Sequence, residues 1–431
     1  MRNLQTRLEE QISGIPRTIV TEFVREKLEA IGHGNNEELL ISVVEQLLVR
    51  TTKDASGLSD DFLEVETDEE VVIQFTDDDA TRVEEAIKNI NKRLPELIQS
   101  VSDQAAHLML RNYERDWADW RSTTDARMDQ FRVNIEARWS SGFDSLRMLI
   151  ELSRDVGADF QRRVRRSRSN RDLHLRDALM RLHVRSIQVA SETMVLMENG
   201  YADGAMARWR TLHEIACVAT LISDGGELLA ERYLAHEIVE ARKAYLQFQR
   251  CSVQLGYKPI SKKDGARIER KYDAIIERFG QDFGTDYGWA SGYVGNSRPT
   301  FSQIEETAGK AVMRSHYKMA SQNVHASAKG IAYRLGSLNG KHAVMAGASN
   351  VGFVEPGQNL ALSLLHITTI LLPKRWTLDK IAKLKVLIRL QRRIPKLLAD
   401  SERAIERSES AILTKSTERL SKQILSRGNR Q

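Results

Sequence analysis

Apolar residues recur every three or four positions along most of the chain, a pattern that predicts amphipathic α-helices. The first 50 residues contain two such stretches, separated at residues 32–36 by glycines and asparagines that favour a turn. The apolar face of the first includes Ile19, Phe23 and Leu28, and that of the second includes Leu39, Leu40, Val43, Val44, Leu47 and Leu48. The N-terminal region is therefore predicted to be a pair of helices.

One segment breaks the helical pattern. In Phe62–Phe75 apolar and acidic residues alternate, a polar turn follows, and β-branched residues come next. Alternation of this kind is typical of strands, so a single β-hairpin is predicted near 62–75. Two strands alone are marginally stable in water, and the hairpin is therefore expected to lie on helices.

From Thr81 to about Asp159 the spacing is helical again, and Tyr113, Trp117 and Trp120 form an aromatic stripe within it. A stripe at helical spacing usually marks a packing seam. Aromatic rings beside arginines also stack on nucleic-acid bases. The sequence favours the packing seam and leaves base stacking open.

Residues 173–372 carry the densest apolar patterns and are predicted to form a helical core. A helical hairpin is expected at 173–221, with its turn at Asn199-Gly200 and with Asp203 as the N-cap of its second helix. Further helices are predicted at 228–255, 301–338 and 360–372, and loops at 280–300 and 340–357.

Charge is unevenly distributed, although the net charge is a modest +5. Asp54–Glu85 contains 13 acidic residues and one basic residue, whereas Pro373–Gln431, predicted to form basic helices, contains 16 Lys and Arg against 6 acids. Arg162–Arg171 adds six arginines without an acid, which favours an exposed linker over a phosphate-contacting strip. The basic end could steer a polyanion, the two ends could attract each other, or both could be solvated helix faces.

The number of cysteines and the length of the apolar runs indicate the cellular compartment of the protein. Two cysteines cannot cross-link a chain of 431 residues, so stability must come from burial, as in a reducing compartment. The longest apolar run, Leu360–Leu372, has about 13 residues, whereas a membrane span needs roughly 20. We therefore expect a cytoplasmic protein with no membrane partner.

The common metal and cofactor motifs are missing from the sequence. It contains no HExxH, ExxH pair, paired CxxC, GxSxG or GxGxxG. These motifs supply zinc and iron ligands, nucleophile elbows and dinucleotide-binding turns. No metal and no cofactor are therefore predicted.

A first polar cluster lies in the stretch Arg208–Glu214, on a helix whose apolar face includes Trp209 and Leu212. Arg210 and Glu214 are four residues apart, so their side chains are neighbours on a helix. His213 adjoins the apolar face.

A second polar cluster is formed by Tyr317, Ser321 and His325, whose spacing of four would place all three on one face of a helix. Tyr317 and Ser321 would then orient the imidazole of His325, which titrates near neutral pH. Arg210 and Glu214 are expected to face this cluster across a helix contact. The arrangement would suit acid–base catalysis and equally a hydrogen-bonded cluster in the core.

The two clusters also carry a resemblance. Residues 173–338 resemble a bacterial family of helical proteins catalogued as domain of unknown function 5677. Its members have an Arg-x-Leu-x-Glu-like element, here Arg210, Leu212 and Glu214, and a Tyr-x-x-x-Ser-x-x-x-His-like element. The resemblance implies a helical fold and no particular activity.

A second resemblance is to the HEPN group of helical ribonucleases, in which a histidine follows an arginine after four to six residues. Arg208 and His213 have a similar spacing, although Trp209 replaces the polar residue that often follows the HEPN arginine. The resemblance implies that Arg208 stabilises phosphate charge and that His213 transfers a proton. It also implies a metal-independent ribonuclease of the kind used in phage defence.

Together these features predict an all-α protein with a multi-helix bundle core, long N-terminal helices, one small β-hairpin and basic C-terminal helices. Four regions are expected, at 1–105, 106–172, 173–372 and 373–431. The leading functional hypothesis is a protein directed to RNA or another polyanion, with ribonuclease activity as its specific form. The alternatives are a non-catalytic helical module that forms homo-oligomers, and a small-molecule enzyme with a pocket between core helices.

Overall fold

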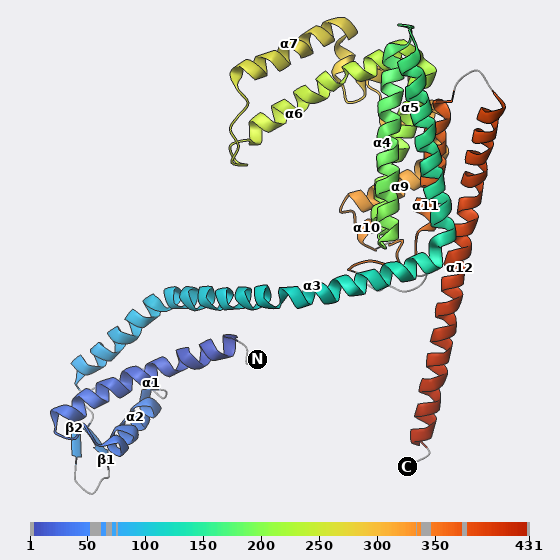
Figure 1. Ribbon diagram of the computed structural model, residues 1–431. Helices are drawn as coiled ribbons and strands as arrows, with labels where there is room; N and C mark the ends of the chain where they lie inside the picture. Colours follow the sequence, from blue (N-terminus) through green and yellow to red (C-terminus); the bar gives the residue numbers. More distant parts are fainter. Residues whose placement is uncertain are drawn as a thin grey trace. The chain divides into compact units, whose positions relative to one another are not determined.

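The computed structural model describes residues 4–51, 62–65, 71–74, 76–332, 334–337, 346–372 and 377–428. Twelve α-helices and one two-stranded antiparallel sheet make up this described part of the chain (Figure 1). The prediction of an all-α fold with one hairpin is therefore confirmed. The chain divides into two compact units, Met1–Thr124 and Asp125–Gln431, and each is described by itself.

The first unit is built on a pair of helices and the hairpin. Its elements are α1 (Leu4–Ala30), α2 (Glu37–Thr51), β1 (Phe62–Val65), β2 (Val71–Gln74) and the first part of α3 (Asp77–Arg166). Phe62 pairs with Gln74, and Val65 pairs with Val71. A small core joins the sheet to the helices as expected, and its buried members are Val20, Val24, Leu28, Leu39, Leu40, Val43, Val44, Leu47 and Ile73. The predicted polar turn of the hairpin lies outside the described residues, as does much of the acidic segment 54–85.

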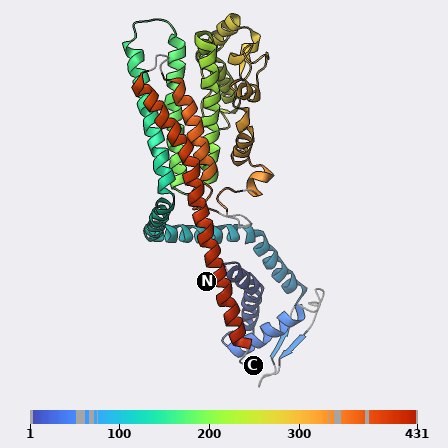
Figure 2. The same cartoon turned by 90° about the vertical axis from the view of Figure 1, so that its right-hand side faces the viewer.

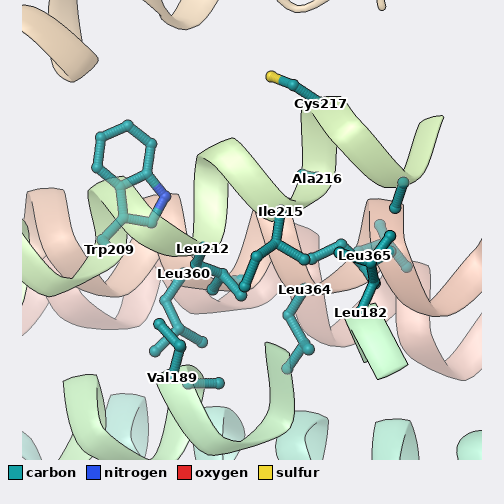
Figure 3. Packing of buried hydrophobic residues seen from close by; sticks show 14 of the residues in the cluster. Leu182, Val189, Trp209, Leu212, Ile215, Ala216, Cys217, Leu360, Leu364 and Leu365 are labelled. Atoms are coloured by element: carbon teal, nitrogen blue, oxygen red, sulfur yellow. The ribbon is translucent and has the colours of Figure 1, made fainter. Parts of the chain in front are cut away.

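The second unit is organised around a helical hairpin, α4 (Leu173–Glu198) and α5 (Ala202–Ala235), packed on α11 (Val354–Ile370). Figure 3 shows Leu212 and Ile215 of α5 pointing towards Leu360 and Leu364 of α11. The hairpin turns where the sequence predicts, and Gly200 adopts a φ of 86°, which glycine tolerates without strain.

The helix α5 differs from the prediction at its N-terminus. Asp203 is not the N-cap, because α5 begins at Ala202, and the Asp203 carboxylate instead accepts hydrogen bonds from Asn323 and from the Leu335 backbone. Gly226, with a φ of 67° and a ψ of −152°, interrupts the helix between the predicted segments 173–221 and 228–255. Leu229 and Ala230 beyond this interruption are buried in the core, which explains why the helix resumes.

A second helical hairpin follows, formed by α6 (Glu237–Cys251) and α7 (Lys262–Phe279). Figure 1 shows the two helices side by side, extending away from α4 and α5, with their connecting loop at the far end. The predicted loop at 280–300 contains two 3₁₀ turns, η1 (Gln281–Gly284) and η2 (Gly288–Ala290).

The prediction of one continuous helix at 301–338 is wrong. This segment is divided into α8 (Phe301–Thr307), η3 (Ala311–Met313), α9 (Arg314–Val324) and α10 (Ala328–Ala332). Gly309 has a φ of 65° just after α8, and His325 has extended backbone just after α9. The hydroxyl of Ser327 then accepts a hydrogen bond from the Gly330 backbone at 3.1 Å, as an N-cap does, and α10 begins.

The basic C-terminal segment forms a single long helix, α12 (Leu378–Gly428), which lies along α11 (Figure 2). Its buried residues Leu387, Leu390, Ile394, Leu398 and Ile405 belong to the main core. A Cβ on Gly142 of α3, or on Gly357 of α11, would lie 2.4 Å from a methyl carbon of Leu398. The first half of α12 is therefore an integral part of the second unit, whatever its charge.

The arginine-rich segment 162–171 also has a structural role. Its first residues complete α3, and residues 167–170 lead to α4. Arg163 donates a hydrogen bond to the Leu371 carbonyl at 2.6 Å, at the C-terminal end of α11, where a cation is favourable. None of the described helices combines the length and the apolar character that crossing a bilayer requires.

Replacing Leu398 should test this packing directly. Leu398→Ala removes a side chain enclosed by two glycine-lined helix surfaces, so we expect the free energy of unfolding to fall by about 2–5 kcal/mol. The matched control is Leu378→Ala in the exposed first turn of α12, with an expected change within about 0.5 kcal/mol. Urea unfolding followed by circular dichroism measures both, and equal effects would show that α12 does not belong to the core.

Candidate functional site

The helices α5 and α9 bring three of the predicted residues together. Arg210 Nη2 donates a hydrogen bond to the Tyr317 hydroxyl at 2.8 Å, and this hydroxyl donates to Glu214 Oε1 at 2.6 Å. Arg210 and Glu214 also form an ion pair at 3.3 Å. The expected approach of Arg210 and Glu214 to Tyr317 is therefore present in the structure.

A second group of contacts lies deeper and ties in α8. His213 Nε2 lies 2.7 Å from Glu305 Oε1, and both side chains are 1% exposed. Arg314 Nη1 donates to the other oxygen of Glu305 at 2.7 Å. His213 and Arg314 therefore meet the Glu305 carboxyl group from two sides. We call the set Arg210, His213, Glu214, Glu305, Arg314 and Tyr317 the α5–α9 polar network.

Aromatic packing supports this network on both sides. The ring of Tyr317 lies 4.8 Å from that of Phe301 and 5.8 Å from that of His213, measured between centroids. The guanidinium carbons of Arg210 and Arg314 lie 4.8 Å and 5.6 Å from the centroid of Tyr317, within cation–π range. The Tyr317 side chain is thus held by both rings and charges.

Burial determines the protonation states within this part of the core. It lowers the pKa of His213, against the opposing effect of Glu305, so the imidazole is neutral near pH 7. Burial and the Glu214 carboxylate raise the pKa of Tyr317, and burial raises the pKa of the neighbouring Cys217 thiol to about 12. The phenol and the thiol therefore stay protonated, and neither is an activated nucleophile.

The charges of the network balance within it. Two arginines face two carboxylates, so these four side chains carry no net charge with which to attract a phosphate group. Its outer side chains, Arg210, Glu214 and Arg314, are between 26% and 35% exposed, whereas the inner pair is sealed. The arrangement therefore suits a cross-link between α5, α8 and α9 better than a reaction centre.

The other two members of the predicted Tyr-Ser-His cluster make no hydrogen bond to a side chain of the network. Ser321 donates a hydrogen bond to the Tyr317 carbonyl at 3.0 Å, within its own helix. His325 is the exposed residue that follows α9, where the backbone is already extended. The expectation that Tyr317 and Ser321 orient His325 on one helical face is therefore wrong, because the helix ends before the third position.

Arg208 and His213 point to different sides of α5. Five residues turn a helix by about 140° beyond a full turn. Arg208 pairs with Glu192 of α4, and His213 pairs with Glu305 of α8. Arg208 lines an open surface hollow of about 760 Å³ on α4, together with Arg154 and Glu192. The arrangement in which one phosphate meets both residues is not formed.

Sequence reasoning missed Glu305 and Arg314. Glu305 lies 92 residues from His213, and no local spacing connects them. Its only sequence signal is an acid inside an amphipathic pattern, at a position that α8 turns inward. Among the described residues, no three His, Cys, Asp or Glu side chains converge closely enough to hold a metal ion.

A comparison with family models identifies the region that contains this network. Residues 176–342 match the model of the Family of unknown function (DUF5677). This segment is a DUF5677 domain. The match confirms the resemblance found in the sequence and covers every residue of the α5–α9 polar network. The chain matches no curated protein and no solved structure.

Removing the Tyr317 hydroxyl should destabilise the DUF5677 domain. Tyr317→Phe leaves Arg210 and Glu214 without their shared partner, so we expect a loss of about 1–3 kcal/mol in unfolding free energy. Tyr257→Phe, at an exposed tyrosine, and His325→Ala should each stay within about 0.5 kcal/mol. Chemical denaturation of the four proteins compares them, and a larger loss in His325→Ala would restore His325 to the site.

Acid should weaken the fold through buried histidines. Burial lowers the pKa of His183 to about 4, and burial with the Lys310 charge lowers that of His366 to about 4. In the unfolded chain histidine titrates near pH 6.5, so between about pH 6.5 and pH 4 the unfolded state binds protons that the folded state does not bind. The stability is full above about pH 6.5 and is lost as the pH falls towards 4.

We expect the unfolding free energy to drop by several kcal/mol between pH 7 and pH 4.5, measured by urea titration at each pH. His183→Gln should reduce the slope by up to about 1.4 kcal/mol per pH unit, because one titrating group is removed. The exposed His325→Gln is the control and should leave the slope unchanged. A wild-type stability that stays flat over this interval would contradict the assignment.

Proposed function

We propose that this protein is a non-catalytic helical module that pairs with a second copy of itself through α3. The main support for this proposal is an apolar stripe on α3, formed by Leu110, Tyr113, Trp117 and Trp120. Each of these side chains is between 54% and 64% exposed. Large aromatic residues left in water at one place are typical of an interaction surface.

The spacing of the stripe favours another helix as the partner. The four residues follow each other at intervals of three, four and three, which is the a/d pattern of a coiled coil over two heptads. Two heptads form a short seam, but the seam lies on a helix of 90 residues that is already formed. Little conformational entropy is then lost when the two surfaces meet.

The flanking charges favour a parallel pair of identical chains. With Leu110 and Trp117 at a positions, Asp116 occupies a g position and Arg121 the e position five residues later. A parallel pair therefore brings Asp116 next to Arg121 of the second copy. An antiparallel pair of the same four layers would bring Glu114 near Glu114, and Asp116 near Asp116, of the second copy.

The DUF5677 domain supports a non-catalytic role. Its candidate acid–base groups are neutral, sealed or paired inside the α5–α9 polar network. A protein that acts by binding does not need these groups to reach a substrate.

A charge placed in the stripe should separate the copies. Trp117→Glu puts a carboxylate into the seam of both chains, so we expect the mass in solution to fall from twice 49.0 kDa to 49.0 kDa. Multi-angle light scattering after size exclusion measures it. The control is Val133→Glu, at an exposed apolar residue of the same helix outside the stripe. A monomeric wild-type protein at micromolar concentration, or loss of pairing in both variants, would contradict the proposal.

Charge reversal tests the parallel orientation within the same experiment. Asp116→Arg and Arg121→Glu should each weaken pairing, and the double variant should restore it. Such recovery is the expected signature of a direct contact between the two positions. Failure of the double variant to recover would leave the antiparallel arrangement.

RNA binding is the second candidate, and the same stripe favours it. Trp117 and Trp120 are exposed beside Arg111, Arg115 and Arg121, and exposed rings beside arginines can stack on unpaired bases. Fluorescence anisotropy with a single-stranded RNA separates the two functions. If Trp117→Glu abolishes RNA binding and the wild-type chain is monomeric, the stripe serves RNA. If the wild-type chain forms dimers and does not bind RNA, the stripe binds the second copy.

A further inference from the structure

The hairpin of α6 and α7 presents a short loop at its end, residues 250–263, which we call the α6–α7 tip. The two helices are firmly joined behind it. Arg242 forms an ion pair with Glu269 at 2.6 Å and lies 4.1 Å from the ring centroid of Tyr272. A Cβ on Gly265 would lie 2.3 Å from the Tyr245 hydroxyl, so the helices approach closely. The tip is therefore carried on a rigid support.

The loop itself has a defined shape. The side-chain amide of Gln249 donates to the Ile260 carbonyl at 3.0 Å and accepts from the Ile260 backbone N–H at 3.2 Å. The Tyr257 N–H donates to the Ser252 carbonyl at 2.8 Å, and Gly256 between them has a φ of 75°. These bonds fix which side chains point outwards.

Three large apolar residues point outwards from this loop. Val253, Leu255 and Tyr257 are between 62% and 74% exposed, within five consecutive residues. The loop could satisfy the same backbone bonds with polar side chains. An ordered loop that holds a cluster of apolar side chains in water is typical of a binding surface.

The charged side chains around these residues are mostly positive, and the adjoining carboxylate, Asp264, accepts a hydrogen bond from Ser261. Arg250, Lys258, Lys262 and Lys263 are exposed, and residues 250–263 contain no acid. The cations nearer the base of the hairpin differ, because Arg242 and Lys243 are paired with Glu269 and Asp286. The tip therefore attracts an anionic partner, and that partner must also accept aliphatic side chains.

We propose that the α6–α7 tip docks on an anionic lipid surface. Lysine and arginine side chains bind anionic headgroups, while valine, leucine and tyrosine enter the interface between headgroups and acyl chains. RNA would match the cations and could stack on Tyr257, but it offers no apolar site for Val253 and Leu255. A lipid interface uses all of these residues.

Docking of this kind does not require a spanning helix. The expectation of no membrane partner came from the lack of a segment long enough to cross a bilayer. A surface contact through a few apolar residues and a basic patch is a different kind of attachment and is reversible.

Vesicle sedimentation with the full chain tests the proposal. The wild-type protein should sediment with vesicles of phosphatidylcholine mixed with phosphatidylserine, and it should stay in solution with phosphatidylcholine alone. The double variant V253S/L255S should lower partitioning at least about tenfold, because two apolar side chains no longer enter the interface. The variant K262E/K263E should lower it by a similar factor or more, since charge attraction becomes repulsion.

Matched controls come from exposed residues outside the tip. Leu228→Ser and Val312→Ser each remove an exposed apolar side chain of the same unit and should leave partitioning unchanged. Circular dichroism checks that all variants keep their helices. Binding that survives both tip variants would overturn the proposal. So would binding to RNA that depends on the tip in a protein that ignores the mixed vesicles, since the tip would then be a nucleic-acid surface.

Discussion

A carboxylate at 1% exposure has to be met by hydrogen-bond donors, and in this protein that requirement joins three helices. Glu305 of α8 is met by His213 of α5 on one side and by Arg314 of α9 on the other. Tyr317 then lies one turn after Arg314, where its hydroxyl reaches both Arg210 and Glu214. The placement of α8 and α9 on the central hairpin follows from satisfying this one charge.

The helix α5 can meet this requirement because it has two different buried sides. Leu212 and Ile215 pack towards α11, and Figure 3 shows Cys217 pointing away from that layer. His213 lies on the side that faces α8 and α9, and its contact with Glu305 is buried. The same burial lowers the pKa of the imidazole, which keeps it neutral, and places it out of reach of a substrate. A buried histidine that meets no solvent is poorly suited to proton transfer.

The two surfaces proposed for function lie outside this network, and their chemistry differs. The stripe on α3 combines aromatic rings with charges of both signs, which suits a second helix of complementary pattern. The α6–α7 tip combines aliphatic residues with mostly positive charges, which suits a planar anionic surface. Each surface is built on a preformed helix or a hydrogen-bonded loop, so binding orders few new residues.

Periodicity in the sequence was sufficient to predict the helical class, the hairpin near 62–75, the turn at Gly200 and the proximity of Arg210 to Glu214, because all of these depend on local spacing. It could not show that the helix at 301–338 breaks into pieces. A glycine at 309 and a histidine at 325 can both occur within a helix, and their backbone conformation depends on what packs nearby. His325 was therefore placed on a helical face that ends before it. Glu305 escaped notice because its partner His213 is 92 residues away in the chain, and Arg314 escaped notice because its partner is Glu305. The stripe at Tyr113, Trp117 and Trp120 has the same spacing whether it is covered or exposed, and coverage depends on which distant segments pack against it. Local spacing determines which residues share a helical face, and only the tertiary structure decides what that face meets.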